Sequence, residues 1–297
     1  MKKKFSIKSF IHFFNIIILF VSCSSSRLSV SEKKHFLWEI NSGQSTVYLL
    51  GSIHVAKKDI YPLDSIIETA FLNSNFIAVE FDLKTVDPFQ VLKLSSYSDE
   101  QTLKENIDSL SYEKIKLAFE KIGIPESVFN KYKPWFAAIN LVMLDLASSG
   151  YNPDAGIDVY FLDKAKIHRK KVLELESFEE HIALMDTLIQ QFGNSFIDYT
   201  LKDLEETKSQ VDQLFQFWKN GDVKAMEDYI KSNIGDDKTY QEMFYLLNDK
   251  RNFNMLKQIK KYLNEPGTYF IVVGAAHLVG ENGLVNLLSK EYKVIQR

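Results

Sequence analysis

The chain has 297 residues, a formal net charge of −3 at pH 7 and 45% hydrophobic residues. This length suffices for one large domain or two ordinary ones, and the proportions of apolar and charged residues are those of a globular protein. The slightly acidic balance argues against a nucleic-acid-binding protein or one that docks on anionic membranes, because phosphate groups are bound by a basic surface.

Residues 1–22 have the pattern of a secretory signal peptide. Four lysines precede the apolar run IHFFNIIILFVS, which is short for a membrane span, and Cys23 follows it. The residues directly before Cys23 resemble a lipobox, and this single cysteine has no disulfide partner in the chain. We therefore expect cleavage before Cys23, lipidation of its thiol, residues 23–35 as a tether and a lipoprotein of the cell envelope. Ordinary secretion and an uncleaved anchor are the alternatives.

The segments that follow the tether predict strands and a helix. FLWEI and STVYLL are β-like runs separated by the turn signal NSGQ, which predicts a hairpin. PLDSIIETAFLNS has apolar residues at helical spacing, with Pro62 near its start. NFIAVEFD then predicts a buried strand that ends in two acidic residues, Glu80 and Asp82.

The rest of the chain is largely helical and returns to strands at its end. From about residue 111 to residue 263 the apolar residues follow the 3.6-residue period, interrupted by one short strand, KKVLELE. TYFIVVG, GLVNLLSKE and YKVIQ then predict a strand, a helix and a last strand. We expect an α/β fold in one domain, residues 36–297. Its central mixed β-sheet comes from the N- and C-terminal segments, and residues 111–263 form a large helical insertion.

The arrangement Gly-x-x-His occurs twice, each time at the end of a predicted strand. His54 follows Gly51 by three residues, and His277 follows Gly274 by three. Glycine permits a sharp turn with positive φ or a close approach to another backbone, and sites in α/β sheets collect at the carboxyl ends of strands. With Glu80 at a third strand end, the two imidazoles and the carboxylate are expected to converge. Such a set suits zinc, manganese, iron or cobalt, or a metal-free acid/base site.

Other polar and aromatic residues have more than one interpretation. Glu176 ends the strand VLELES and is expected to support the site, whereas Asp158 in GIDVY is as suited to cap a helix as to support the site. A single histidine is most often structural, and three histidines are interpreted in that way, namely His35, His168 and His181. Trp135 and Trp218 are predicted to belong to the core.

Taken together, these pieces resemble the TraB/GumN family, which is related to the Tiki proteases. The resemblance runs from about Phe36 to Arg297. Its matching pieces, in order, are FLWEI, VYLLGSIHV, YPL, FIAVEFD, KPWFAAINL, GIDVYFLDKAKIHRKKVLELES, FWKNGD, RNFNMLKQI and FIVVGAAHLVGENGLVNLL. One departure is FEEHIALM, because relatives commonly carry glutamine at the position of His181.

The resemblance implies metal-dependent hydrolysis, with peptide bonds as the substrate in the Tiki branch. Carried over by position, the site consists of His54, Glu80 and His277, with Arg251 and Asn252 beside them. The cofactor would be a divalent transition metal such as manganese, cobalt or zinc, and the partner a peptide or protein substrate. Such a metal lowers the pKa of bound water from near 16 toward roughly 7.

Several roles and functions stay open at this stage. Glu80 is suited to be a metal ligand or the base that takes the proton of water. Arg251 is suited to hold an oxyanion or a substrate carboxylate, or only to form a salt bridge at a helix start. Two other functions are compatible with the same residues. One is a non-catalytic, lipid-anchored peptide-binding protein, and the other is a metal-free, esterase-like hydrolase that uses His54 and Glu80 as acid and base.

Overall fold

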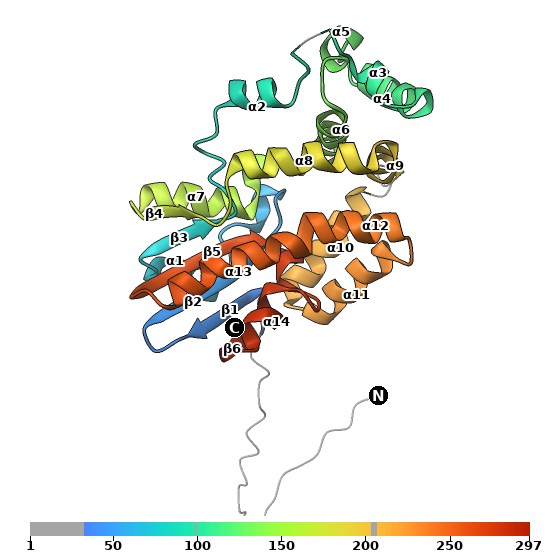
Figure 1. The fold of residues 1–297 in the computed structure, drawn as a ribbon. Coiled ribbons are helices and arrows are strands. Elements are labelled where there is room, and N and C mark those ends of the chain that lie inside the picture. Colours follow the sequence, from blue (N-terminus) through green and yellow to red (C-terminus); the bar gives the residue numbers. More distant parts are fainter. Residues whose placement is uncertain (1–32, 99, 203–206) are drawn as a thin grey trace, which may run out of the picture. The chain divides into compact units, whose positions relative to one another are not determined.

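A six-stranded mixed sheet is the centre of the computed structural model, which describes residues 33–98, 100–202 and 207–297 (Figure 1). The expected signal peptide, Cys23 and the tether up to residue 32 lie outside the described residues. The strands are β1 (Leu37–Asn41), β2 (Ser45–Ser52), β3 (Phe76–Val79), β4 (Lys171–Glu174), β5 (Gly267–Gly274) and β6 (Val294–Gln296). Their order in the sheet is β4-β3-β5-β2-β1-β6. This sheet confirms the predicted α/β fold.

The topology aligns three strand ends on one edge of the sheet. β1 and β2 form the predicted antiparallel hairpin, whereas β2, β5, β3 and β4 run parallel to one another. β5 comes from the C-terminal segment and lies between β2 and β3. In the register, Ser52 is opposite Gly274, and Val79 is opposite Val272. The carboxyl ends of β2, β3 and β5 therefore meet at the edge where α/β proteins bind ligands.

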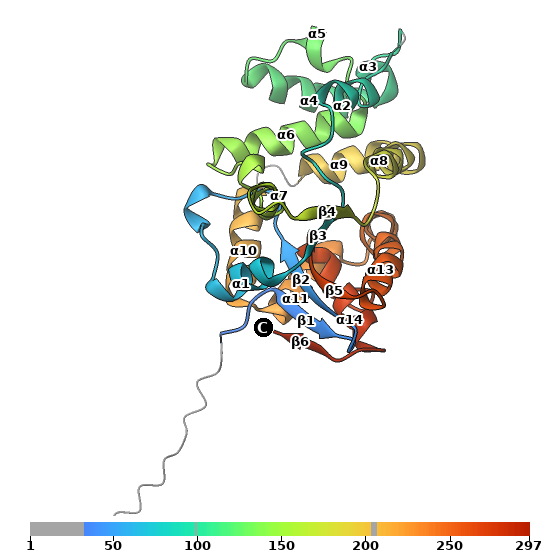
Figure 2. The ribbon, with the colours of Figure 1, turned by 90° about the vertical axis from the view of Figure 1, so that its left-hand side faces the viewer.

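Helices cover both faces of the sheet (Figure 2). α1 (Ser65–Asn73) and α7 (Ile157–Ile167) pack on one face, and α13 (Lys250–Leu263) and α14 (Leu284–Ser289) lie on the other. The buried residues of α13 are spaced three or four apart and form one face of the helix, namely Asn252, Met255, Ile259 and Leu263. This spacing fixes which side of α13 faces solvent.

A second group of helices lies beyond the carboxyl edge of the sheet and has its own apolar core (Figure 1). Trp135 is buried in this core, and Trp218 is buried against the sheet, so the prediction for both is confirmed. The helices of this group are α2 (Pro88–Leu94), α3 (Leu103–Asn106), α4 (Ser109–Lys121), α5 (Glu126–Phe129), α6 (Pro134–Ser148), α8 (Phe178–Phe192), α9 (Asn194–Lys202) and α12 (Lys238–Phe244). Two further helices, α10 (Thr207–Asn220) and α11 (Val223–Ile234), pack apolar side chains into the core of the sheet.

The helical part differs in two ways from a simple insertion between sheet segments. Helices begin with α2, before the start expected at about residue 111. In addition, α7 and β4 lie inside the range 111–263, yet they pack with the sheet because β4 pairs with β3. Among the described residues, no helix is long and apolar enough to cross a membrane.

Candidate functional site

The three strand ends bring His54, Glu80 and His277 around one point. Glu80 directly follows β3, His54 follows β2 by two residues, and His277 lies in a short 3-10 helix, Ala275–Leu278, after β5. A Cβ atom placed on Gly274 would lie 3.1 Å from His54 Nε2, 3.4 Å from Glu80 Oε1 and 3.5 Å from His277 Cδ2. The described structure therefore places the three predicted side chains together.

Gly51 and Gly274 are needed for space rather than for an unusual backbone conformation. Neither is among the glycines with positive φ, and Gly274 has a φ of −51°. The expected positive φ is therefore wrong. A Cβ on Gly51 would lie 3.0 Å from Phe36 Cδ1 and 3.2 Å from Ala275 Cα, so the strand end touches its neighbours directly. The close approach, which glycine also permits, is the reason for both residues.

Glu80 is buried, and both of its carboxylate oxygens have interaction partners. Its Oε1 atom accepts a hydrogen bond from the Gly274 N–H at 2.7 Å, and its Oε2 atom pairs with Arg251. Burial alone would raise the pKa of Glu80, but His277, Arg251 and the Gly274 N–H together hold that pKa below its usual range. Glu80 is therefore a carboxylate at neutral pH.

Arg251 joins Glu80 to two further residues of the site. Its guanidinium donates to Glu176 through Nε (2.9 Å) and Nη2 (2.7 Å), and Nη1 lies 3.2 Å from His277 Nε2. Glu176 therefore supports the site through Arg251. A π-helical turn, Tyr245–Asp249, directly precedes α13 and leads into Arg251. Sequence reasoning missed this turn, which is a frequent feature of functional sites.

Each of the two imidazoles has an acceptor on Nδ1. His54 Nδ1 lies 2.9 Å from Asp158 Oδ2, and His277 Nδ1 lies 2.7 Å from Asn252 Oδ1. Carboxylate and amide oxygens only accept, so both Nδ1 atoms carry a proton and both Nε2 atoms are left for the site. Asp158 also accepts from Ser52 Oγ at 2.7 Å, and it does not cap α7, whose N-cap is Gly156.

The two histidines differ in protonation and in access. The Asp158 carboxylate raises the pKa of His54 to about 9, whereas burial lowers the pKa of His277 to about 4. At pH 7 the His54 ring therefore carries a positive charge and the His277 ring is neutral. The His54 side chain is 59% exposed, while that of His277 is 7% exposed. A ligand that enters the site meets His54 first.

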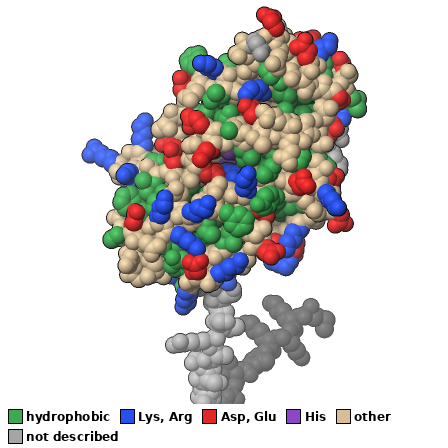
Figure 3. All heavy atoms as spheres, viewed as in Figure 1, with side chains coloured by type: hydrophobic (Ala, Val, Ile, Leu, Met, Phe, Trp, Pro, Cys, Tyr) green, Lys and Arg blue, Asp and Glu red, His purple; other side chains and the backbone are tan. Residues whose placement is uncertain are grey.

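A cavity of about 550 Å³ opens over this centre, between the sheet edge and helices α6 and α8. His54, Glu80, Arg251 and His181 line its polar part, and the apolar lining includes Phe81, Leu83, Ile139 and Met143. In Figure 3 histidine atoms are visible near the middle of this face, between acidic and basic side chains. The cavity gives the three strand-end residues access to a ligand.

Sequence reasoning gave no role to His181, which lines the same cavity. Its Nδ1 atom is enclosed and has no hydrogen-bond partner among the described residues. Burial lowers the pKa of His181 to about 4, so the ring is neutral at pH 7. The only signal in the sequence was the departure from glutamine at this position of the family pattern.

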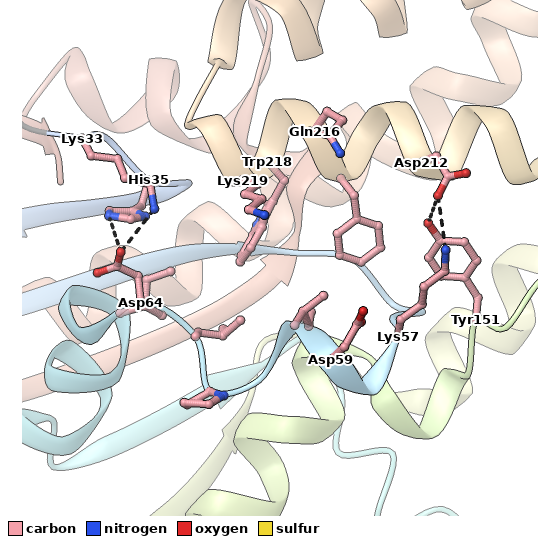
Figure 4. A pocket seen from close by; sticks show the side chains of 15 residues that line it. Lys33, His35, Lys57, Asp59, Asp64, Tyr151, Asp212, Gln216, Trp218 and Lys219 are labelled. Carbon is pink, nitrogen blue, oxygen red and sulfur yellow. Dashed lines mark hydrogen bonds and ion pairs between the residues drawn. The ribbon is translucent and has the colours of Figure 1, made fainter.

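A second cavity, of about 450 Å³, lies near the start of the described chain (Figure 4). His35, interpreted from sequence as an ordinary residue of the tether, is buried there at 3.6 Å from Asp64. Asp64 also pairs with Lys33, and Asp212 accepts from Tyr151 at 2.5 Å. None of the residues predicted for the site lines this cavity, so the cavity over Gly274 is the better candidate for a functional site.

The residues around Gly274 fit a divalent transition metal by their chemistry. Two imidazoles with supported Nδ1 atoms and one carboxylate form a donor set of the kind that binds zinc or manganese. The three carboxylates of Glu80, Glu176 and Asp158 exceed the positive charges of the Arg251 guanidinium and the His54 ring by one, so a cation would balance the charge. In their present positions, the described residues contain no group of three His, Cys, Asp or Glu side chains arranged to hold an ion. Binding of an ion requires Arg251 to release both Glu80 Oε2 and His277 Nε2.

Comparison with known proteins shows which family the chain matches. The sequence pattern of the TraB/PrgY/gumN family matches residues 36–296. The chain is 27% identical over 259 residues to the uncharacterized protein YbaP of Escherichia coli, a match that covers 86% of this chain and 93% of YbaP. It is 22% identical over 196 residues to an uncharacterized protein of Treponema pallidum, covering 63% of this chain and 57% of that protein. No solved structure matches.

Proposed function

Because the chain belongs to the TraB/PrgY/gumN family, we propose that it is a metal-dependent hydrolase of the cell envelope that cleaves peptide bonds. The observation that carries this proposal is the convergence of His54, Glu80 and His277 around Gly274. The open cavity beside them has room for part of a peptide.

His54, His277 and Glu80 would hold the metal ion. Manganese, cobalt or zinc would supply a Lewis acid there, which activates water and polarises the scissile carbonyl. His54 would have to lose its Nε2 proton before it could hold the ion, so metal binding would strengthen as the pH rises. Asp158 and Asn252 keep both imidazoles in the orientation that directs Nε2 to the site.

Arg251 and Glu176 act on the substrate side of the centre. Once Arg251 releases Glu80, its guanidinium is free to hold the developing negative charge of the attacked carbonyl. Glu176 keeps the guanidinium in place through its hydrogen bonds with Nε and Nη2. A metal-free reaction with Glu80 as the base is less favoured, because a carboxylate with a lowered pKa accepts protons poorly at neutral pH.

The location in the cell envelope is a proposal that depends on the N-terminal sequence. The lysine-rich start, the short apolar run and Cys23 support export and attachment to a lipid. The catalytic centre would then act on peptides or proteins outside the cytoplasm.

One observation favours a second candidate, a peptide-binding protein without catalysis. Both carboxylate oxygens of Glu80 already have partners, namely Arg251 and the Gly274 N–H. A site that keeps this ion pair would bind peptides in the cavity and leave their bonds intact.

Metal content and hydrolysis distinguish the two candidates. The purified protein, loaded separately with manganese, cobalt and zinc, is incubated with a mixture of unstructured peptides, and the products are identified by mass spectrometry. We expect about one ion per chain, cleavage with at least one metal and no cleavage after EDTA. Glu80→Gln should abolish cleavage, whereas Glu179→Gln, at an exposed glutamate of α8, should not. Cleavage that survives EDTA would contradict metal dependence, and intact peptides under all conditions would favour the binding protein.

A further inference from the structure

His181 is held in a fixed position at the wall of the candidate site. Ser177 and Glu180 form a capping box at the start of α8, in which Ser177 Oγ accepts from the Glu180 N–H at 3.1 Å. The His181 ring lies 5.1 Å from the Phe81 ring, measured between centroids. Because the helix start and this aromatic contact restrain the ring, it faces the cavity in a defined orientation.

The two nitrogen atoms of His181 have different surroundings. Nδ1 is enclosed without a partner. Nε2 makes no hydrogen bond with the described residues and is not enclosed, so it is the nitrogen that faces the cavity. Unlike His54 and His277, this ring has no acceptor that fixes a proton on Nδ1.

The enclosed position of Nδ1 selects the tautomer. A neutral imidazole has one N–H and one bare nitrogen. Burying an N–H without an acceptor leaves a strong donor unsatisfied, and such orphaned donors are rarer in proteins than unsatisfied acceptors. The bare nitrogen is therefore Nδ1, and Nε2 presents its N–H to the cavity as a donor.

The surroundings of this donor indicate the group that it binds. Phe81, Leu83, Ile139 and Met143 line the cavity beside His181 and provide an apolar wall. The wall suits an apolar side chain of a ligand, because contact between the two removes apolar surface from water. The charges that line the cavity are mixed, because Glu80, Asp154 and Asp158 lie there together with Lys84, Arg251 and the His54 ring. No excess of positive charge favours an anionic acceptor for the N–H, so an uncharged carbonyl oxygen suits it.

We propose that His181 is a substrate-positioning residue whose Nε2–H donates to a main-chain carbonyl of a bound peptide, with an apolar side chain of that peptide against the wall formed by Phe81, Leu83, Ile139 and Met143. This inference rests on the proposed function for its peptide ligand. It concerns binding, so it is tested separately from cleavage.

The test measures peptide binding in the Glu80→Gln protein, in which cleavage is not expected. The probes are fluorescein-labelled, capped pentapeptides of alanine with a central leucine or a central serine, followed by fluorescence anisotropy. In this background His181→Phe keeps an aromatic ring but removes the donor, and His181→Gln keeps an N–H donor. We expect His181→Phe to weaken binding of the leucine peptide roughly three- to tenfold, the range for one net hydrogen bond. We expect His181→Gln to bind within about twofold of the parent protein, and the serine peptide to bind more weakly than the leucine peptide.

The results separate this inference from the proposed function. It is overturned if His181→Phe binds as tightly as the parent, if His181→Gln binds as weakly as His181→Phe, if serine and leucine peptides bind equally, or if the parent binds neither peptide. Unchanged thermal unfolding of the variants shows that the fold is retained. If the Glu80→Gln proteins bind with this pattern but wild type cleaves nothing with any metal, the hydrolase proposal fails and the role of His181 stands.

Discussion

Glu80 and Arg251 form an ion pair inside the candidate site, with 9% and 12% of their side chains exposed. The guanidinium also contacts Glu176 and His277, so it connects residues that follow three different strands. Glu80 is in turn tied to the end of β5 by the Gly274 N–H. The ion pair therefore stabilises the cluster of His54, Glu80 and His277. It is also the contact that must open before a metal ion can bind Glu80.

Loss of Arg251 should destabilise the fold strongly. Arg251→Gln leaves Glu80 and Glu176 buried without their cation, and breaking such a pair costs about 3–5 kcal/mol of unfolding free energy. Arg297→Gln is the matched control, because Arg297 pairs with Glu39 nearer the surface and its side chain is 43% exposed. We expect this control to lose less than about 1 kcal/mol in urea unfolding. Equal losses in the two variants would contradict a structural role for the buried pair.

Alanine at the two glycines should have different effects. A Cβ at Gly51 meets Phe36 and the backbone of Ala275, so Gly51→Ala should lower the unfolding free energy by about 1–3 kcal/mol. A Cβ at Gly274 meets the ends of the site side chains, which shift more easily. Gly274→Ala should therefore lose less stability and more activity. Urea unfolding and peptide hydrolysis measure the two effects, and wild-type behaviour of both variants would refute the close-approach explanation.

Acid should destabilise the protein partly through His181. The native ring faces Arg251, Glu80 and His54 and stays neutral down to about pH 4, because burial lowers its pKa. In the unfolded chain a histidine binds a proton at about pH 6.5. Between these values the unfolded state binds more protons, so stability falls as the pH falls from 6.5 toward 4.

His181→Gln should remove this part of the acid sensitivity. Its melting temperature should fall less between pH 7 and pH 5 than that of wild type. His168→Gln, at an exposed position, should follow wild type. If all three proteins lose the same number of degrees, His181 is not the buried neutral group described above.

Lipid attachment should depend on Cys23. Cys23→Ser should remove the acylated thiol and prevent processing of the signal peptide in cells. Metabolic labelling with a fatty acid, followed by membrane fractionation, measures this. Equal label in wild type and variant would contradict the lipoprotein prediction.

The central part of the site could be predicted because the ends of strands can be recognised in the sequence. Apolar runs that stop at Gly51, Glu80 and Gly274 mark three strand ends. Parallel strands place their carboxyl ends on one edge, so the convergence of His54, Glu80 and His277 follows from local patterns and one topological rule. The parallel pairing of β5 with both β2 and β3 agrees with that rule here.

The rest of the site depends on packing that local sequence does not encode. Asp158 reaches His54 across 104 residues of sequence, and its position near a helix start left a helix cap and a supporting role equally open. The π-helical turn before Arg251 has the same apolar spacing as an α-helix would show. His181 faces the cavity because α8 packs against α6 and brings this ring against Phe81, which follows β3. A turn with positive φ was expected at the glycines, since sequence does not distinguish that need from a need for space.

A double-mutant cycle tests most directly whether the two Gly-x-x-His turns build one metal-dependent site. The rate of peptide hydrolysis is measured for the manganese-loaded wild type, His54→Ala, His277→Ala and the double variant. Since residues that act as a unit are strongly non-additive, each single variant should lose almost all activity and the double variant should be little worse than either. Losses that multiply, or a His277→Ala protein with wild-type activity, would contradict a shared site.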